Sequence, residues 1–166
     1  LLMRLEELGY WPAQLRITII VLIPKKIGKR PIGLLVSLIR LWERLRIPEV
    51  RCWKDQNFRD YNWAARGRSA QDAVWRQSVC VEAATQRGHV TISNLSDLVK
   101  AYEMVPLENV WRAGLKLHLP PDILRMELEA FAAARTLLVN GVCSDPVLSL
   151  SALVAGASTQ RTAYCW

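Results

Sequence analysis

The segment Asn94 to Glu103 holds a carboxylate and an aromatic ring at a spacing that could support metal-dependent chemistry. A run of apolar and small residues ends at Asp97, and Tyr102 follows five residues later. We expect Val90 to Leu95 to form a strand, which would place Asp97 at its end. A carboxylate there can bind Mg²⁺, a hard cation that prefers oxygen ligands. Two-metal nucleotidyl transfer needs at least two such carboxylates, and a lone Asp after a strand is more often a turn residue or a helix cap.

A second candidate site is the basic segment Lys25 to Arg30, which contains three lysines and one arginine around Gly28. Arginine presents a planar fork of donors to a phosphate group, and lysine presents a point charge. Lys25 or Lys26, together with Arg30, could therefore hold a phosphate group. The alternative is a turn whose cations are only solvated.

A third candidate site consists of Arg66, Arg68 and Gln71. The letters SAQD, which include Gln71, resemble a helix capping box. These side chains could contact a nucleic-acid backbone, with Trp63 or Trp75 as a platform on which a base stacks. Burial of both tryptophans in the protein core is at least as good an explanation for the two rings.

The charge is unevenly distributed along the chain. Residues 1–90 hold sixteen Lys and Arg against eight Asp and Glu, a net charge of +8, whereas residues 91–166 hold six against seven, a net charge of −1. A basic half is typical of proteins that bind a polyanion, most often nucleic acid. Composition alone is equally consistent with a basic surface that only keeps the protein soluble.

Composition also bears on the class of protein. Hydrophobic residues make up 51% of the 166 residues, which excludes a disordered tail and permits one globular core. No apolar run approaches the roughly 18 residues of a membrane span, and no secretory signal is recognisable. The four cysteines are dispersed, with no CxxC pair and no histidine nearby. We therefore expect no zinc site and an intracellular setting, either cytoplasmic or nuclear.

The first half of the chain predicts a hairpin followed by a helix. The β-branched run Ile17 to Ile23 is typical of a buried strand, and Pro31 to Leu35 of a second strand at a sheet edge. The four cations would then lie at the tip of this hairpin. We expect a helix to begin with Ser37 as its N-cap and to end at Pro48, and an irregular connection over residues 49–68.

The second half alternates helices with short strands. The capping box should open a helix that runs to about Arg87, and prolines should open two more, at Pro106 and at Pro120. The pair Asn140–Gly141 between apolar runs is a strong signal for a short hairpin. These elements together predict an α+β fold.

Five segments, in this order, resemble conserved blocks of reverse transcriptases of the non-LTR retrotransposon and group II intron type. They are similar to the fingers hairpin, the second conserved block, the first palm motif, the strand pair before the second palm motif, and the start of that motif. The segments are Leu22–Ile32, Gly67–Ala73, Asp97–Tyr102, Arg135–Gly141 and Ala155–Gln160.

The resemblance implies a role for each candidate residue. Asp97 would bind both catalytic Mg²⁺ ions, assisted by the backbone carbonyl of Leu98, and Tyr102 would be the steric gate under the sugar of the incoming nucleotide. The resemblance gives nucleotide contacts to Lys25, Lys26, Arg30 and Gln160, and template contacts to Arg66, Arg68 and Gln71.

The chain also departs from the family. Glu103 stands where the family usually has Asp, and the block at Gly156 lacks the usual Gln-Gly pair. The 166 residues contain no Tyr-x-Asp-Asp motif, so we expect a truncated polymerase. The prediction is the fingers plus a partial palm of a right-hand polymerase, with residues 1–88 as the fingers-like region and residues 89–166 as the partial palm.

The implied parent activity is RNA-templated addition of deoxynucleotides to a DNA primer with two Mg²⁺ ions. Its partners would be an RNA template, a DNA primer and deoxynucleoside triphosphates, with no membrane. We expect the chain to be inactive in isolation, as a fragment. The alternatives are a non-catalytic basic nucleic-acid-binding domain, and a structural or interaction protein with a basic surface.

Overall fold

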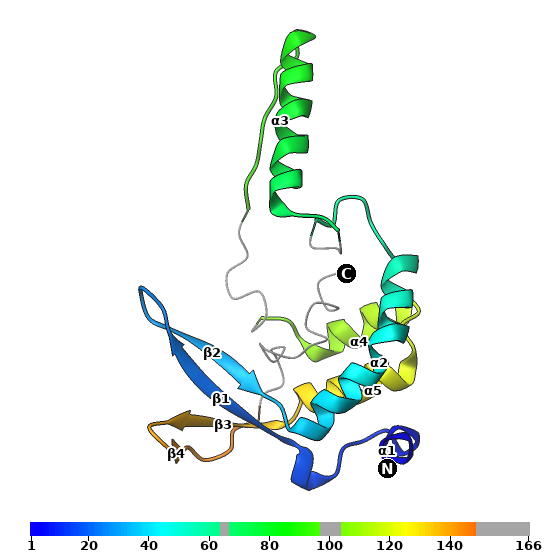
Figure 1. The fold of residues 1–166 in the computed structure, drawn as a ribbon, viewed down its shortest axis with the longest axis vertical. Helices are drawn as coiled ribbons and strands as arrows, with labels where there is room; N and C mark the ends of the chain where they lie inside the picture. Colours follow the sequence, from blue (N-terminus) through cyan, green and yellow to red (C-terminus); the bar gives the residue numbers. More distant parts are fainter. Residues whose placement is uncertain (64–66, 97–103, 149–166) are drawn as a thin grey trace. The chain divides into compact units, whose positions relative to one another are not determined.

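The chain combines helices with one mixed β-sheet, as the computed structural model in Figure 1 shows. The structure describes residues 1–63, 67–96 and 104–148. The prediction of an α+β fold is confirmed. Contacts divide the chain into two compact units, Leu1–Asn57 with Lys100–Trp166, and Phe58–Val99. The division into a fingers-like region over residues 1–88 and a partial palm over residues 89–166 stays a prediction.

The sheet of the first unit joins two segments that lie far apart in the sequence. Its strand order is β2-β1-β3-β4; β1 pairs antiparallel with β2 and parallel with β3, and β3 pairs antiparallel with β4. The strands are β1 (Ile17–Pro24), β2 (Lys29–Leu34), β3 (Ala134–Val139) and β4 (Val142–Cys143).

Both predicted hairpins form. Pro31 lies opposite Leu22 on the edge strand β2, where its missing N–H leaves no gap in the sheet. Asn140 and Gly141 connect β3 to β4 with φ angles of 50° and 81°, so both central residues of this tight turn lie in the left-handed region. Asn and Gly tolerate this region best, which is why the pair predicts the turn.

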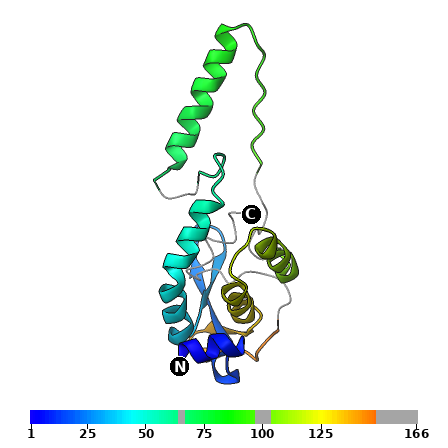
Figure 2. The same cartoon turned by 90° about the vertical axis from the view of Figure 1, so that its right-hand side faces the viewer.

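The hydrophobic core of this unit lies among its helices. Trp11, Trp42, Leu124 and Phe131 are buried there, and the rings of Trp11 and Trp42 meet edge to face with centroids 5.6 Å apart. The Trp11 Nε1 donates a hydrogen bond to the Met126 carbonyl at 2.9 Å, which satisfies the polar atom of a buried ring. Figure 2 shows the helices from a second direction. They are α1 (Leu2–Leu8), α2 (Ser37–Gln56), α4 (Leu107–Lys116) and α5 (Pro121–Phe131), with a 3₁₀ turn at Ala13–Leu15.

The predicted end of α2 at Pro48 is wrong, because the helix continues to Gln56. Proline lacks the N–H that would bond the carbonyl four residues earlier, and this normally breaks a helix. Here Val50 and Trp53 are buried beyond the proline, and Trp53 Nε1 donates to the Leu117 carbonyl at 2.6 Å. Tertiary packing therefore holds the second half of α2 in place. The predicted N-cap is also wrong, since Val36 caps the helix without a side-chain bond.

The second unit is built on α3 (Ala70–Gln86), and its predicted capping box is present. The Ser69 hydroxyl accepts a hydrogen bond from the Asp72 N–H at 3.1 Å, and the Asp72 carboxylate accepts one from the Ser69 N–H at 2.9 Å. No described residue of this unit is buried. The helix is therefore stabilised by its cap and by local contacts more than by a core.

The strand predicted over Val90 to Leu95 does not form. Residues 90–96 adopt no helix or strand, and Val90, Ile92 and Leu95 are each about nine-tenths exposed. A pattern of apolar residues becomes a strand only where a neighbouring strand supplies hydrogen bonds and a covering face. None of the described strands pairs with this segment.

None of the helices that the structure describes is both long and apolar enough to cross a membrane.

Candidate nucleic-acid interface

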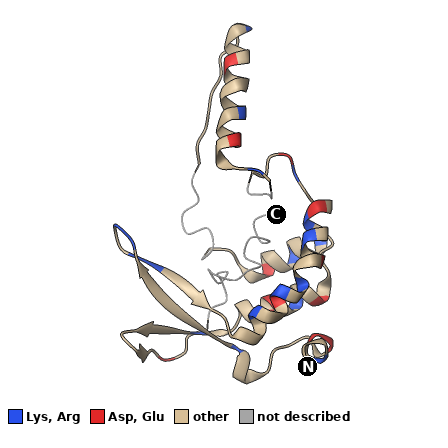
Figure 3. Cartoon of the chain, in the orientation of Figure 1, with Lys and Arg blue, Asp and Glu red and all other residues tan. Residues whose placement is uncertain are grey.

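The basic hairpin β1–β2 presents its four cations at one end (Figure 3). The Lys25 N–H donates to the Gly28 carbonyl at 3.1 Å and closes the turn between Pro24 and Lys29. Gly28 has a φ of 80°, a conformation that other residues rarely adopt. A glycine at this position lets the chain reverse tightly, so that cations flank the turn on both strands.

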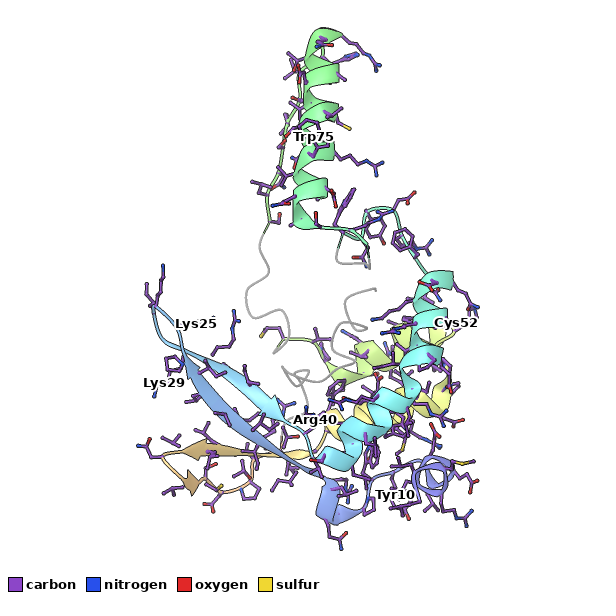
Figure 4. The ribbon with its side chains drawn as sticks, in the orientation of Figure 1. Tyr10, Lys25, Lys29, Arg40, Cys52 and Trp75 are labelled. Carbon is purple, nitrogen blue, oxygen red and sulfur yellow. The ribbon has the colours of Figure 1, made fainter. Side chains whose placement is uncertain are left out.

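The hairpin cations are exposed and have no acidic neighbour on their own strands. Lys25, Lys26, Lys29 and Arg30 are all exposed, and no ion pair joins any of them to another described residue. The sequence holds no carboxylate between Glu7 and Glu43. Figure 4 labels Lys25 and Lys29 near the end of the hairpin. The structure therefore brings together the three predicted phosphate-binding residues Lys25, Lys26 and Arg30.

Alternation along the strand distributes these cations over both faces of the hairpin. Arg30 lies opposite Ile23, and Lys29 lies opposite Pro24. Because successive side chains of a strand point to opposite faces, Arg30 and Lys29 lie on opposite faces of the hairpin. A phosphate chain could thus be contacted from either side of the hairpin tip.

The predicted template residue Arg68 already has partners within its own unit. Its guanidinium carbon lies 4.4 Å from the centre of the Phe58 ring and 4.9 Å from the centre of the Trp63 ring. It donates to the Asp60 carbonyl at 2.6 Å and lies 3.3 Å from the Asp60 carboxylate. These contacts close the loop before α3, a role that the sequence analysis did not foresee.

The other candidates of this region differ in exposure. Gln71 is exposed in the first turn of α3. Trp63 is half-buried and contacts two arginines, Arg68 and, at 5.8 Å, Arg76. Trp75 is 73% exposed on α3 and belongs to no core, so its ring is the more accessible of the two predicted base platforms.

Five predicted site residues lie outside the part of the chain that the structure describes. They are Arg66, Asp97, Leu98, Tyr102 and Gln160.

These five residues include both predicted Mg²⁺ ligands, Asp97 and Leu98. Within the described residues, no group of three or more His, Cys, Asp or Glu lies close enough to hold a metal ion.

Arginines elsewhere in the first unit are of two kinds. Arg46 on α2 donates from Nε to Glu6 at 2.8 Å and from a terminal nitrogen to Glu49 at 2.5 Å, and the Glu6 hydrogen bond raises the pKa of its guanidinium. Arg135 on β3 donates to the Phe131 carbonyl at 3.2 Å, and burial lowers its pKa. Arg40, Arg44 and Arg51 on α2 are exposed, and no motif in the sequence indicates a role for them.

Comparison with models of known protein families gives no match, and comparison with curated proteins gives none.

Proposed function

We propose that the chain is part of a reverse transcriptase and that its described part binds nucleic acid through the basic hairpin β1–β2. The observation that carries the proposal is the group of four exposed cations at one end of a hairpin without carboxylates. Such a group favours phosphate, because arginine and lysine side chains replace the counterions of a nucleic acid when they bind it.

Two further observations support the family assignment. The segments that resemble the fingers hairpin and the strand pair before the second palm motif both form hairpins, and they lie in one sheet through the parallel pairing of β1 with β3. The segment that resembles the second conserved block begins a capped helix. In this proposal residues 1–88 contribute to the fingers and Asp97 belongs to the palm.

The catalytic part of the proposal concerns Asp97, Leu98 and Tyr102. Mg²⁺ bound at Asp97, with the Leu98 carbonyl, would supply the charge that stabilises in-line displacement at a phosphate. Tyr102 would limit the space under the sugar of the incoming nucleotide. The sequence contains no paired aspartates, so we propose that the activity of these 166 residues is binding and not synthesis.

The binding proposal is tested by salt titration. A fluorescent single-stranded RNA and an RNA–DNA hybrid are titrated with the full chain, and anisotropy gives the affinity at several salt concentrations. The hairpin variant Lys25→Gln, Lys26→Gln, Arg30→Gln should bind more weakly. The slope of its plot of log affinity against log salt concentration should be shallower by about two units. Each of the three lost phosphate contacts on a single strand contributes roughly 0.7 to this slope.

A matched control removes the same charge elsewhere. The variant Arg4→Gln, Arg112→Gln, Lys116→Gln also loses three positive charges, from exposed positions of α1 and α4. We expect a smaller loss of affinity and a nearly unchanged slope. Equal behaviour of the two variants would overturn the hairpin as the site and leave only the effect of net charge.

The alternative of a non-catalytic nucleic-acid-binding domain makes a different prediction for triphosphates. If the hairpin grips an incoming nucleotide, a deoxynucleoside triphosphate with Mg²⁺ should displace labelled RNA from the wild-type chain more effectively than the same nucleoside monophosphate. That preference should disappear in the hairpin variant. Equal displacement by both nucleotides in the wild-type chain would favour the binding domain.

A further inference from the structure

Helix α2 carries a row of three arginines on its outer side. Arg40, Arg44 and Arg51 are exposed, and we refer to them as the arginine stripe. At about 3.6 residues per turn they fall within an arc of roughly 40°, and at about 1.5 Å per residue they span about 16 Å along the helix axis. The stripe is therefore a row of positive charge along one side of the helix.

The stripe is not neutralised by the acidic residues of α2. Glu49 pairs with Arg46, and the carboxylate-bearing side chain of Glu43 is buried. Asp55 shares the outer side one turn beyond Arg51, but no ion pair joins any arginine of the stripe to another described residue. The arginines of one helix thus differ, since Arg46 forms ion pairs with carboxylates and the three arginines of the stripe form none within the described part of the chain.

The stripe is also held in a fixed position. The opposite side of α2 is buried through Ile39, Trp42, Val50 and Trp53, and Trp53 is hydrogen bonded to Leu117 on another segment. Figure 4 shows Arg40 near the start of the helix, which begins three residues after β2 ends. Because the helix cannot rotate away, a ligand that meets the stripe does not have to order it first.

We propose that the arginine stripe is a second binding surface for nucleic acid, and that it takes the phosphates of a strand along the axis of α2. The guanidinium groups favour a phosphate chain as the partner. Three of them in a row match a linear series of phosphates, and each can bind a phosphate through paired hydrogen bonds. The proposal rests on nucleic-acid binding by the chain as proposed above, and it adds a surface distinct from the hairpin.

A membrane surface fits the stripe less well. Helices that bind lipid surfaces insert an apolar side beneath their basic side. The apolar residues Ile39, Trp42, Val50 and Trp53 of α2 are buried in the protein core and cannot insert without unfolding the unit, which leaves Leu41 and Leu45 as the exposed large apolar residues of the helix. Anionic vesicles are nevertheless a useful arm of the test, because their headgroups also carry phosphate.

The test uses the full chain and a stripe variant, Arg40→Gln, Arg44→Gln, Arg51→Gln. Glutamine removes the charge, keeps a polar side chain and favours helix about as well as arginine. The same labelled RNA is titrated at several salt concentrations, beside the hairpin variant and the control variant defined above. We expect the stripe variant to lose affinity by about tenfold or more at 0.1 M salt, with a slope shallower by about two units.

The outcomes separate this inference from the proposed function. A hairpin variant that binds weakly beside a stripe variant that matches the control would overturn the stripe and leave the proposed function standing. Loss in neither variant would overturn both. If the stripe variant loses binding to phosphatidylserine vesicles but keeps its affinity for RNA, the surface serves a membrane and the inference is wrong.

A second variant keeps the test sharp if the first is unstable. The variant Arg40→Lys, Arg44→Lys, Arg51→Lys keeps the charge and removes the planar forks. We expect an unchanged salt slope with an affinity between those of the wild-type and the glutamine variant. A lysine variant that binds as tightly as the wild-type chain would contradict phosphate contact through the planar forks, and circular dichroism would show whether either chain is folded.

Discussion

Arg68 is a cation of a basic protein whose side chain makes contacts within the protein, although the sequence suggested that it contacts a ligand. Its guanidinium lies against Phe58 and Trp63 and donates a hydrogen bond to Asp60, so three residues contact one side chain. Sequence spacing placed Arg68 beside a capped helix and suggested a template contact. The ring contacts require Phe58 and Trp63 to lie close to Arg68, which no local pattern in the sequence specifies.

Replacing Arg68 by alanine should loosen this loop. Each contact of a cation with a ring contributes about 0.5–1 kcal/mol at an exposed site, and the Asp60 side chain is too exposed for its ion pair to add much. We expect the free energy of local opening to fall by about 1–2 kcal/mol. Hydrogen exchange of residues 58–63, followed by mass spectrometry, measures this change.

The control for this experiment is Arg59→Ala, which removes a neighbouring exposed arginine of the same loop. Exchange should stay close to that of the wild-type chain. Equal acceleration by both substitutions would show that net charge, and not ring contact, governs the loop.

At the scale of elements, features that depend on neighbouring residues were predictable and features that depend on distant ones were not. The hairpin turn at Asn140–Gly141 and the capping box at Ser69 follow from local backbone chemistry, and both form. The continuation of α2 past Pro48 depends on Trp53 and Leu117, which lie 64 residues apart. The strand expected at Val90 could form only beside a partner strand from another part of the chain. The local sequence does not show whether such a partner is present.

Substituting Pro48 by alanine should stabilise the protein. Alanine restores the N–H that can bond the Arg44 carbonyl, and proline inside a helix costs about 3 kcal/mol relative to alanine. Because the helix already accommodates Pro48, we expect a gain of about 1–3 kcal/mol, measured as a higher unfolding temperature.

Pro121 is a matched control for this substitution, since it occupies the first turn of α5, where proline is well tolerated. Pro121→Ala should leave the unfolding temperature nearly unchanged or slightly lower. A destabilised Pro48→Ala chain would mean that α2 requires the geometry that proline imposes.

Removing the cap of α3 should shorten the helix. Ser69→Ala deletes the hydroxyl that accepts the Asp72 N–H, at a cost of about 1 kcal/mol. We expect lower helicity and faster hydrogen exchange in the first turn of α3. Ser78→Ala in the same helix is the comparison, because that hydroxyl bonds only the Val74 carbonyl, and its removal should leave α3 intact.

At the scale of the whole molecule, the sequence predicts the fold class better than it predicts which strands pair with each other. Alternating apolar runs and turn signals predicted an α+β protein, and charge predicted where cations gather. The parallel pairing of β1 with β3 was not predictable, because no turn links these strands and their register follows from packing across most of the chain. Of the candidate site, the hairpin cations could be placed, while Asp97 and Tyr102 lie outside the described residues.

The chain of 166 residues should not extend a primer. Nucleotidyl transfer by two metals needs more than one carboxylate, and Asp97 is the only residue to which the resemblance gives a metal-binding side chain. We expect no product from an RNA template, a DNA primer, deoxynucleotides and Mg²⁺, with a complete reverse transcriptase as the positive control. Extension that disappears in the Asp97→Ala chain would contradict this prediction.

The pairing of β1 with β3 has a consequence for how the protein is made. Ile17 lies opposite Ala134, and Trp11 is bonded to the carbonyl of Met126, so neither can find its partner until most of the chain has left the ribosome. At roughly 5–20 residues per second this delay is on the order of ten seconds. Meanwhile the apolar strand β1 is open to association with other nascent chains, and the lysines that follow it oppose such association through their charge. The cations that could bind a phosphate chain would thus also protect β1 of the nascent chain from aggregation.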